Sequence, residues 1–209
     1  GIKIALPAAG VEHCLAQASI CFMFAPGFHP AMKNVVPVRK ALGVRTVFNI
    51  LGPLLNPAAT KRALIGVYSQ EMVGLMANAL FELGVELVMV VFCGGLDELA
   101  PIAVATVATV TPGGVEMGTV DPFELGFQKC TIADLKGGTA VENAQILKQV
   151  LAGELSGPMT DTVVLNAGAG LYVAGAAGSV KEGCAMAAAC IKAGKPMATL
   201  TQWAAASQA

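Results

Sequence analysis

The sequence is long enough for one domain with a substantial core, or for one domain plus part of another, and its composition excludes some classes of protein. It has 209 residues, of which 55% are apolar and 13% are charged. This balance indicates a buried interior rather than a disordered chain. The formal net charge is −1 and the sequence has no basic run, so a large nonspecific nucleic-acid footprint is not expected.

The first part of the chain predicts strands and helices in alternation. The pattern is read from apolar periodicity, proline breaks and glycine stops. The predicted elements are a helix at 8–18, a strand at 21–25, a helix at 30–42 with a break at Pro37, a turn region at 46–57, a strand at 62–68 and a helix at 70–83.

The second part begins with a nearly continuous apolar run at 86–93 and ends in helices. Such a run is typical of a strand that is covered on both faces. The later predicted elements are a hairpin of 104–110 and 115–120, a loop at 134–138, and helices at 139–151, 161–176, 180–193 and 196–206. Asp161 and Ser179 are candidate N-caps for two of these helices.

Alternating strands and helices indicate an α/β fold with a partly parallel sheet. The sequence shows no repeat of fixed period and no low-complexity linker, so one domain over residues 1–209 is predicted. Two stretches without charge, at 99–115 and 162–180, are diluted by proline, glycine and polar residues, which favours packing in a soluble protein over a membrane span. No signal-peptide pattern is visible at the start.

Cysteines and histidines give no metal-binding or nucleophile motif. The six cysteines are scattered, with no CxxC pair and no zinc spacing. They indicate reduced, buried thiols in an intracellular protein. His13 is interpreted as a surface or boundary residue. The glycine-rich run at 166–178 lacks the GxGxxG spacing, so it indicates close helix packing.

An acid pair, Asp97 and Glu98, stands out because it follows the predicted strand at 86–93 and two glycines. Ligands of open α/β sheets lie beyond the carboxyl ends of strands. Magnesium is commonly held by one or two carboxylates together with substrate phosphates. The acid pair is therefore a candidate Mg²⁺ site, although a solvated turn would have the same residues.

A second candidate cluster is basic and lies near the start of the chain. It contains His29, Lys33 and Arg39, flanked by Pro26 and Pro30. A guanidinium is well suited to binding a carboxylate. From the residues alone, a helix with a basic face in water is the favoured interpretation.

The whole chain resembles anthranilate phosphoribosyltransferases. The stretch FMFAPGFHPAMKNVVPVRKALGVRTVFNILGPLLNPA at 22–58 carries most of the resemblance. The elements GLDE, DLKGG, ENA and LNAGAGLYVAG follow it in the family's order. Together these elements are highly specific, although each alone would not be.

The resemblance implies a fold, a reaction and a metal. The fold is the large α/β domain of this family, a mixed, largely parallel sheet flanked by helices, normally joined to a small helical domain and paired as a homodimer. The reaction transfers the phosphoribosyl group of phosphoribosyl pyrophosphate to anthranilate in tryptophan biosynthesis, with release of pyrophosphate. Mg²⁺ is the implied metal.

The resemblance also assigns roles to residues of this chain. His29 and Met32 would line the acceptor channel, and Arg39 would hold the anthranilate carboxylate. Gly52 and Pro53 would form a wall against the ring. The acid pair would bind the magnesium, and no residue is assigned as an acid–base catalyst.

The sequence departs from the family in two respects. The family's N-terminal helical domain, which forms part of the dimer contact, is expected to be missing from this chain. The family's GTGGD loop and KHGNR-like segment, which hold the donor, are absent from the 209 residues. The chain is therefore expected to be a fragment that is inactive alone. Any transit peptide would lie upstream, so the expected compartment is the plastid for a plant or algal source and otherwise the cytoplasm.

Three other interpretations remain open at this stage. A pyrimidine-nucleoside phosphorylase would share the broad architecture. A non-catalytic relative that binds nucleic acid is disfavoured by the near-neutral charge. A truncated product without a function of its own is the third.

Overall fold

The computed structural model of the chain describes residues 1–30, 41, 43 and 48–209. The chain divides into two compact units. One consists of Gly1–Leu51 and Gly194–Ala209, and the other of Gly52–Ala193. The predicted assignment of residues 1–209 to one domain stays a prediction.

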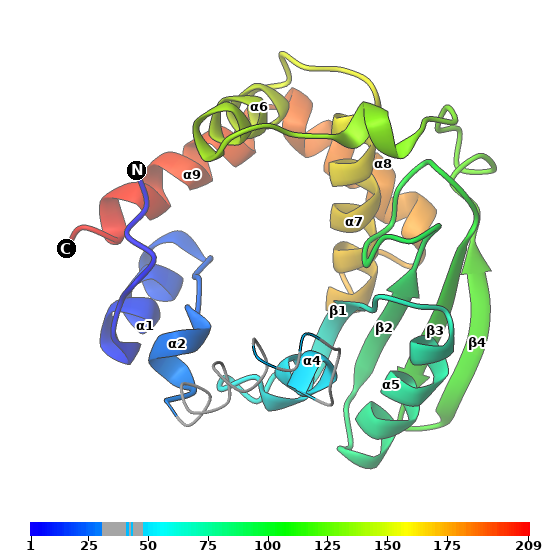
Figure 1. The fold of residues 1–209 in the computed structure, drawn as a ribbon. Coiled ribbons are helices and arrows are strands. Elements are labelled where there is room, and N and C mark those ends of the chain that lie inside the picture. The colour runs from blue at the N-terminus through cyan, green and yellow to red at the C-terminus, as the bar shows by residue number, and fades with distance from the viewer. Residues whose placement is uncertain (31–40, 42, 44–47) are drawn as a thin grey trace. The chain divides into compact units, whose positions relative to one another are not determined.

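The first unit is helical in its described part. Its helices are α1 (Ala8–Ala18), α2 (Ala25–Phe28), α4 (Phe48–Leu51) and α9 (Lys195–Ala206). Helix α1 packs against α9, and the two ends of the chain lie near each other (Figure 1). Hydrogen bonds join these ends. The backbone N–H of Lys3 donates to Ser207 Oγ at 3.0 Å, and Gln208 Nε2 donates to the carbonyl of Gly1 at 2.8 Å.

The second unit contains a four-stranded mixed sheet. Its strands are β1 (Arg62–Gly66), β2 (Leu87–Phe92), β3 (Ala105–Thr111) and β4 (Gly114–Val120), in the order β1-β2-β3-β4. Strands β1 and β2 are parallel because helix α5 (Glu71–Glu82) connects them. The predicted mixed α/β sheet is confirmed.

The described sheet contains fewer parallel pairs than the predicted largely parallel sheet. β2 pairs with β3, and β3 with β4, in antiparallel orientation. The reason lies in the connections. Residues 93–104, which join β2 to β3, contain no helix, and β3 and β4 form the predicted hairpin, which closes where Thr111 faces Gly114.

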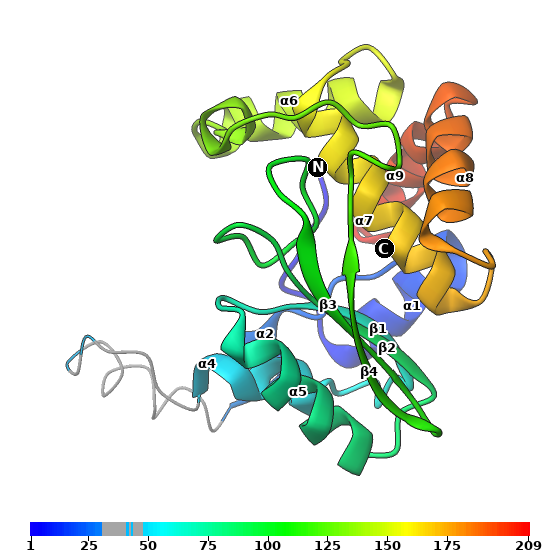
Figure 2. The ribbon, with the colours of Figure 1, turned by 90° about the vertical axis from the view of Figure 1, so that its right-hand side faces the viewer.

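Helices cover both faces of the sheet. Helix α5 packs on β2 and β3, and α7 (Pro158–Ala174) packs on β1 and β2 from the other side (Figures 1 and 2). Helix α8 (Val180–Lys192) packs against α7. The remaining elements are η1 (Gly52–Leu55), η2 (Ile132–Leu135) and α6 (Ala140–Ala152).

The core between the sheet and helices α7 and α8 is built from apolar side chains of alternating strand positions. Strand residues one apart point to opposite faces, so odd-numbered residues of β2 and β3 reach this core. Its buried members include Met89, Val91, Val107, Leu165 and Ala169. The even-numbered Val88 and Val90 are buried as well, which confirms the expectation that this strand is covered on both faces.

Helices α7 and α8 approach each other through glycines. A Cβ placed on Gly168 would lie 2.6 Å from the backbone nitrogen of Cys184, and one on Gly183 would lie 2.2 Å from the carbonyl oxygen of Gly168. These distances leave no room for a methyl group. The glycine-rich run therefore packs helices, as the sequence predicts.

The remaining predictions agree in most elements, fail in one and are untested in another. Helices α1, α5, α6, α7, α8 and α9 and strands β1 and β2 lie where they are predicted, within a few residues. The predicted strand at 21–25 is wrong, because 21–24 is irregular and α2 begins at Ala25 with Pro26 in its first turn. The predicted helix at 30–42 falls almost wholly outside the described residues.

The two candidate caps differ in outcome. Ser179 caps α8, since its side chain accepts a hydrogen bond from the backbone N–H of Glu182. Asp161 is not a cap: α7 begins earlier, at Pro158, with Gly157 as its N-cap residue. Proline favours the first position of a helix, and this places Asp161 inside the first turn.

Among the residues that the structure describes, no helix combines the length and the apolar composition needed to cross a membrane.

The glycine contact between α7 and α8 predicts a stability difference between two positions of one helix. Gly168→Ala should destabilise the fold by about 1–3 kcal/mol because the methyl group overpacks the contact. Gly170→Ala is the matched control, since its Cβ would meet nothing within 4 Å, and it should be neutral or gain up to about 1 kcal/mol from helix propensity. Urea unfolding followed by circular dichroism measures both, and equal stabilities would contradict the assignment.

Candidate functional site

The acid pair follows β2 after a tight turn. Cys93 and Leu96 exchange two backbone hydrogen bonds, of 3.0 and 2.9 Å, across Gly94 and Gly95. Both glycines have positive φ, 55° and 98°, which side chains strongly disfavour. The turn therefore requires glycine. It reverses the chain direction directly after β2, so the acid pair that follows it lies near the carboxyl end of this strand.

The backbone of Asp97 also contacts Gly66, the last residue of β1. A Cβ on Gly66 would lie 1.5 Å from the carbonyl oxygen of Asp97. Only glycine leaves space for the Asp97 backbone against the strand. The position of the acid pair is thus fixed by a contact between backbones, while the Asp97 and Glu98 side chains are exposed to solvent.

Helix α7 holds the residue that follows the acid pair. Asn166 Oδ1 accepts a hydrogen bond from the backbone N–H of Leu99 at 3.0 Å, and Asn166 Nδ2 donates to the Leu99 carbonyl at 2.7 Å. Nδ2 also donates to the carbonyl of Thr162 at 2.8 Å. Because Leu99 is 1% exposed, the Asn166 amide satisfies backbone groups that water cannot reach.

The pKa of Glu98, the second member of the acid pair, is raised. Although Glu98 is exposed as a residue, partial desolvation of its carboxyl raises its pKa above the ordinary value of 4.5, and the neighbouring Asp97 charge raises it further. A nearby cation would oppose both effects, since an opposite charge favours the ionised form. The carboxylate of Glu98 is therefore suited to contact with a positive group.

A cavity of about 550 Å³ lies beside Glu98. Its polar lining is one carboxylate, one ammonium and one hydroxyl, from Glu98, Lys136 and Thr162, and the other lining residues are Leu96, Ile132, Ala133, Leu135 and Met159. Lys136 belongs to the DLKGG element and is exposed. Glu98 and Lys136 thus line the same cavity.

The chemistry of the donor set fits magnesium. In the part of the chain that the structure describes, no group of three or more His, Cys, Asp and Glu side chains is placed to hold a metal ion. Two exposed carboxylates offer only hard oxygen ligands. Mg²⁺ accepts such a site because it keeps several waters and shares its coordination with substrate phosphates.

The predicted acceptor residues are only partly described. His29 follows α2 in the first unit, where its backbone N–H donates to Ala25 at 2.9 Å, and its side chain is half-buried. Gly52 and Pro53 are exposed in η1, in the second unit. Met32 and Arg39 lie outside the described residues. The acceptor site therefore stays a prediction.

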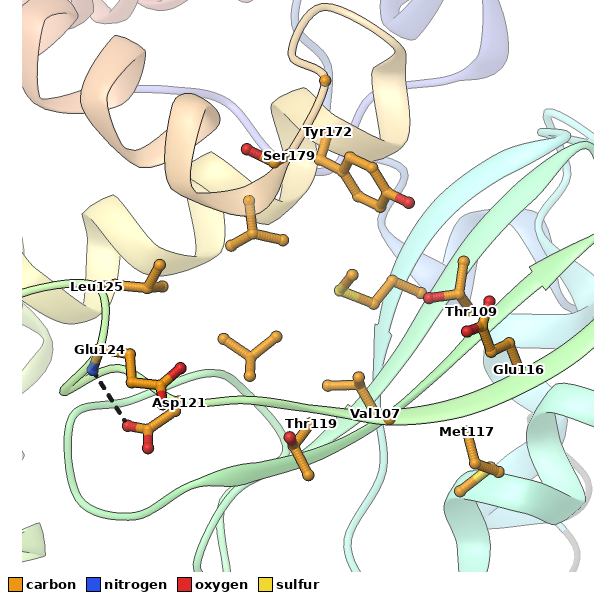
Figure 3. A pocket seen from close by; sticks show the side chains of 15 residues that line it. Val107, Thr109, Glu116, Met117, Thr119, Asp121, Glu124, Leu125, Tyr172 and Ser179 are labelled. Atoms are coloured by element: carbon orange, nitrogen blue, oxygen red, sulfur yellow. Dashed lines mark hydrogen bonds between the residues drawn. The ribbon is translucent and has the colours of Figure 1, made fainter.

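A second cavity, of about 460 Å³, contains none of the predicted site residues. Figure 3 shows Thr109, Glu116 and Tyr172 among its lining residues. The carboxylate of Asp121 at its edge accepts a hydrogen bond from the backbone N–H of Phe123 at 2.8 Å. Its lining acids are Glu116, Asp121 and Glu124.

Three residues around the acid pair are missing from the sequence-based site: Gly66, Asn166 and Lys136. Gly66 has no turn signal around it, because its role is a close approach rather than a positive φ. Asn166 is the one residue of the glycine-rich run with a carboxamide, which is the signal that could have singled it out. Lys136 lies in a segment whose sequence predicts only a loop.

Comparison with known proteins places this chain in a family. Residues 1–197 match the family model described as the glycosyl transferase family, a/b domain. An anthranilate phosphoribosyltransferase of Methanosarcina barkeri is 45% identical over 203 residues, which are 97% of this chain and 55% of that relative. The chain spans about half to three fifths of the length of the curated relatives it matches.

Solved structures agree with the sequence comparison. The anthranilate phosphoribosyltransferase of Thermus thermophilus has a TM-score of 0.91 and 40% identity, and the match covers 100% of this chain and 62% of that one. The Saccharomyces cerevisiae enzyme in complex with PRPP and Mg has a TM-score of 0.89 and 29% identity, covering 97% and 58%. The yeast enzyme in complex with 4-fluoroanthranilate has a TM-score of 0.91 and 28% identity, and the match covers 100% of this chain and 60% of that one. The chain therefore belongs to the glycosyl transferase family, through the a/b domain that its residues 1–197 match.

Proposed function

We propose that the intact protein carrying this chain transfers the phosphoribosyl group of phosphoribosyl pyrophosphate to anthranilate, as a step of tryptophan biosynthesis. The observation that carries the proposal is the acid pair, held at the carboxyl end of β2 by a two-glycine turn and by Gly66. Relatives 40–46% identical that are named anthranilate phosphoribosyltransferase support the choice of substrates.

The acid pair would hold Mg²⁺ in this reaction. A metal at that place would neutralise charge on the departing pyrophosphate. The two carboxylates would bind the ion, and the backbone that carries them is held by Gly66 and Asn166. The yeast enzyme with PRPP and Mg supports the choice of metal. We propose Asp97 and Glu98 as its protein ligands.

The acceptor half of the site would recognise a flat ring with one carboxylate. Arg39 is proposed to hold that carboxylate with two parallel hydrogen bonds. His29 and Met32 would line the channel, and Gly52 with Pro53 would offer backbone to the ring without an intervening side chain. Accurate placement of the amine is the main contribution expected from this half.

The donor half of the site would depend on residues outside the 209. The sequence contains neither a GTGGD loop nor a KHGNR segment, and two carboxylates alone do not bind a phosphorylated sugar. We therefore propose that this chain by itself is inactive. We further propose that the intact protein acts as a homodimer.

The acceptor proposal predicts a specific kinetic defect. In the intact protein, Arg39→Ala should raise the KM for anthranilate about 10- to 100-fold, because a charge-assisted hydrogen bond to the substrate is lost. The assay follows the loss of anthranilate fluorescence with phosphoribosyl pyrophosphate and Mg²⁺ present. Lys40→Ala serves as the control and should leave this KM unchanged. An unchanged KM in Arg39→Ala would rule out the assignment.

The raised pKa of Glu98 predicts a pH-dependent stability difference in metal-free buffer. The folded chain holds a proton on Glu98 more tightly than the unfolded chain does. Ionisation of Glu98 therefore lowers the free energy of unfolding as the pH rises from the ordinary pKa of 4.5 through the raised pKa of the folded chain. At a pH below 4.5, Glu98 is protonated in both the folded and the unfolded chain, and this loss disappears. Glu98→Gln should thus melt above the unsubstituted chain at pH 7.

Thermal melts across the pH range check this expectation. The difference in Tm should vanish as the pH falls below the ordinary value, and added Mg²⁺ should narrow it at pH 7, since the cation stabilises the ionised carboxylate. A difference that is the same at every pH would show that Glu98 is not held in the raised-pKa environment.

A further inference from the structure

Asn166 makes an unusual set of contacts for a residue inside a helix. It lies in the third turn of α7, and its carboxamide makes three hydrogen bonds, all to backbone groups. Two of these bonds go to one residue, Leu99, which is 67 positions away in the sequence. An amide that donates to and accepts from the same residue fixes the orientation of that residue's backbone as well as its distance.

Leu99, which Asn166 binds, directly follows Glu98 in the chain. β2 ends at Phe92, and the two-glycine turn ends at Leu96, so no strand pairing reaches Leu99. Among the described residues, Asn166 is the one hydrogen-bond partner of the buried N–H and C=O groups of Leu99, and buried backbone groups need a partner. Asn166 therefore controls the backbone at the point where the acid pair re-enters the core.

The Asn166 side chain has a rigid foundation. Helix α7 is packed on β1 and β2, and two residues further along the helix it meets α8 through Gly168. The opposite side of the acid pair rests on Gly66, where the Asp97 carbonyl occupies the space of a Cβ. The acid pair is thus held from β1 at Asp97 and from α7 at the residue after Glu98.

We infer that Asn166 is a positioning residue for the metal carboxylates: it fixes the backbone of Leu99 and thereby the place from which Glu98 reaches the ion. The inference rests on the proposed metal-binding role of the acid pair. Partners that orient metal ligands typically contribute about 10- to 100-fold to metal affinity. The Asn166 carboxamide would contribute at the low end of that range, because it acts through the backbone.

The experiment uses the 209-residue chain and Mn²⁺ alone as the probe. Asn166→Leu keeps the number and branching of the side-chain heavy atoms and removes all three hydrogen bonds. Asn166→Ser is a milder second variant, whose hydroxyl can still reach the Thr162 carbonyl within the helix. Thr160→Val is the matched control, since it deletes a 2.8 Å hydrogen bond from α7 to Leu155 without touching the acid pair.

Two readouts are needed, because a merely structural role would change only one. Hydrogen exchange at the Leu99 amide reports the hydrogen bonds between Asn166 and Leu99. The electron paramagnetic resonance signal of free Mn²⁺ reports the metal affinity. In both Asn166 variants the Leu99 amide should lose protection, and Mn²⁺ should bind about tenfold more weakly. Thr160→Val should bind Mn²⁺ as the unsubstituted chain does.

The outcomes separate the inference from the proposed function. A folded Asn166 variant that binds Mn²⁺ with unchanged affinity, or keeps its Leu99 amide protected, would overturn the positioning role alone. If the unsubstituted chain binds Mn²⁺ no better than the Asp97→Asn, Glu98→Gln double variant, the proposed metal site fails. The positioning role then fails with it.

Discussion

The candidate site depends on one close contact between backbones, that of Gly66 with Asp97. The Asp97 carbonyl lies where a side chain of β1 would otherwise be. This contact requires glycine for reasons of space, and it places the acid pair on the end of the parallel strand pair. The two-glycine turn after β2 and the hydrogen bonds from Asn166 then complete the loop that carries Asp97 and Glu98.

Helix α7 links the core of the second unit to this loop. On one side its Gly168 allows the backbone of α8 to approach, and its apolar residues enter the core beneath the sheet. Asn166, two residues earlier, binds the backbone beside the acid pair. Because the same helix packs in the core and binds the loop, the position of the charged loop is fixed relative to the core. A binding site needs this kind of pre-organisation.

Much of the fold could be predicted from local sequence signals, and the failures have physical causes. The apolar run at 86–93 and the hairpin of 104–110 and 115–120 have strong local patterns, and the structure confirms both. The short apolar run at 21–25 has no periodicity to distinguish strand from helix, and Pro26 favours a helix start. For Asp161, the competing proline at 158 begins the helix earlier.

The site itself was only partly accessible from sequence. The acid pair could be predicted because its place after a strand and two glycines is a local feature. Gly66 and Asn166 could not, since their roles exist only where segments 31 and 67 residues apart meet. The acceptor residues rest on family resemblance, and Arg39, which is predicted to hold the carboxylate, lies outside the described part of the chain.

Asp97 and Glu98 are proposed to form a two-carboxylate metal site that is already built into the fold. An anomalous difference map from crystals of the chain with Mn²⁺ and pyrophosphate tests it most directly. We predict a peak at the acid pair, at about 2.1 Å from a carboxylate oxygen, the distance typical of magnesium-type coordination. Peaks elsewhere, with none at Asp97 or Glu98, would contradict the account.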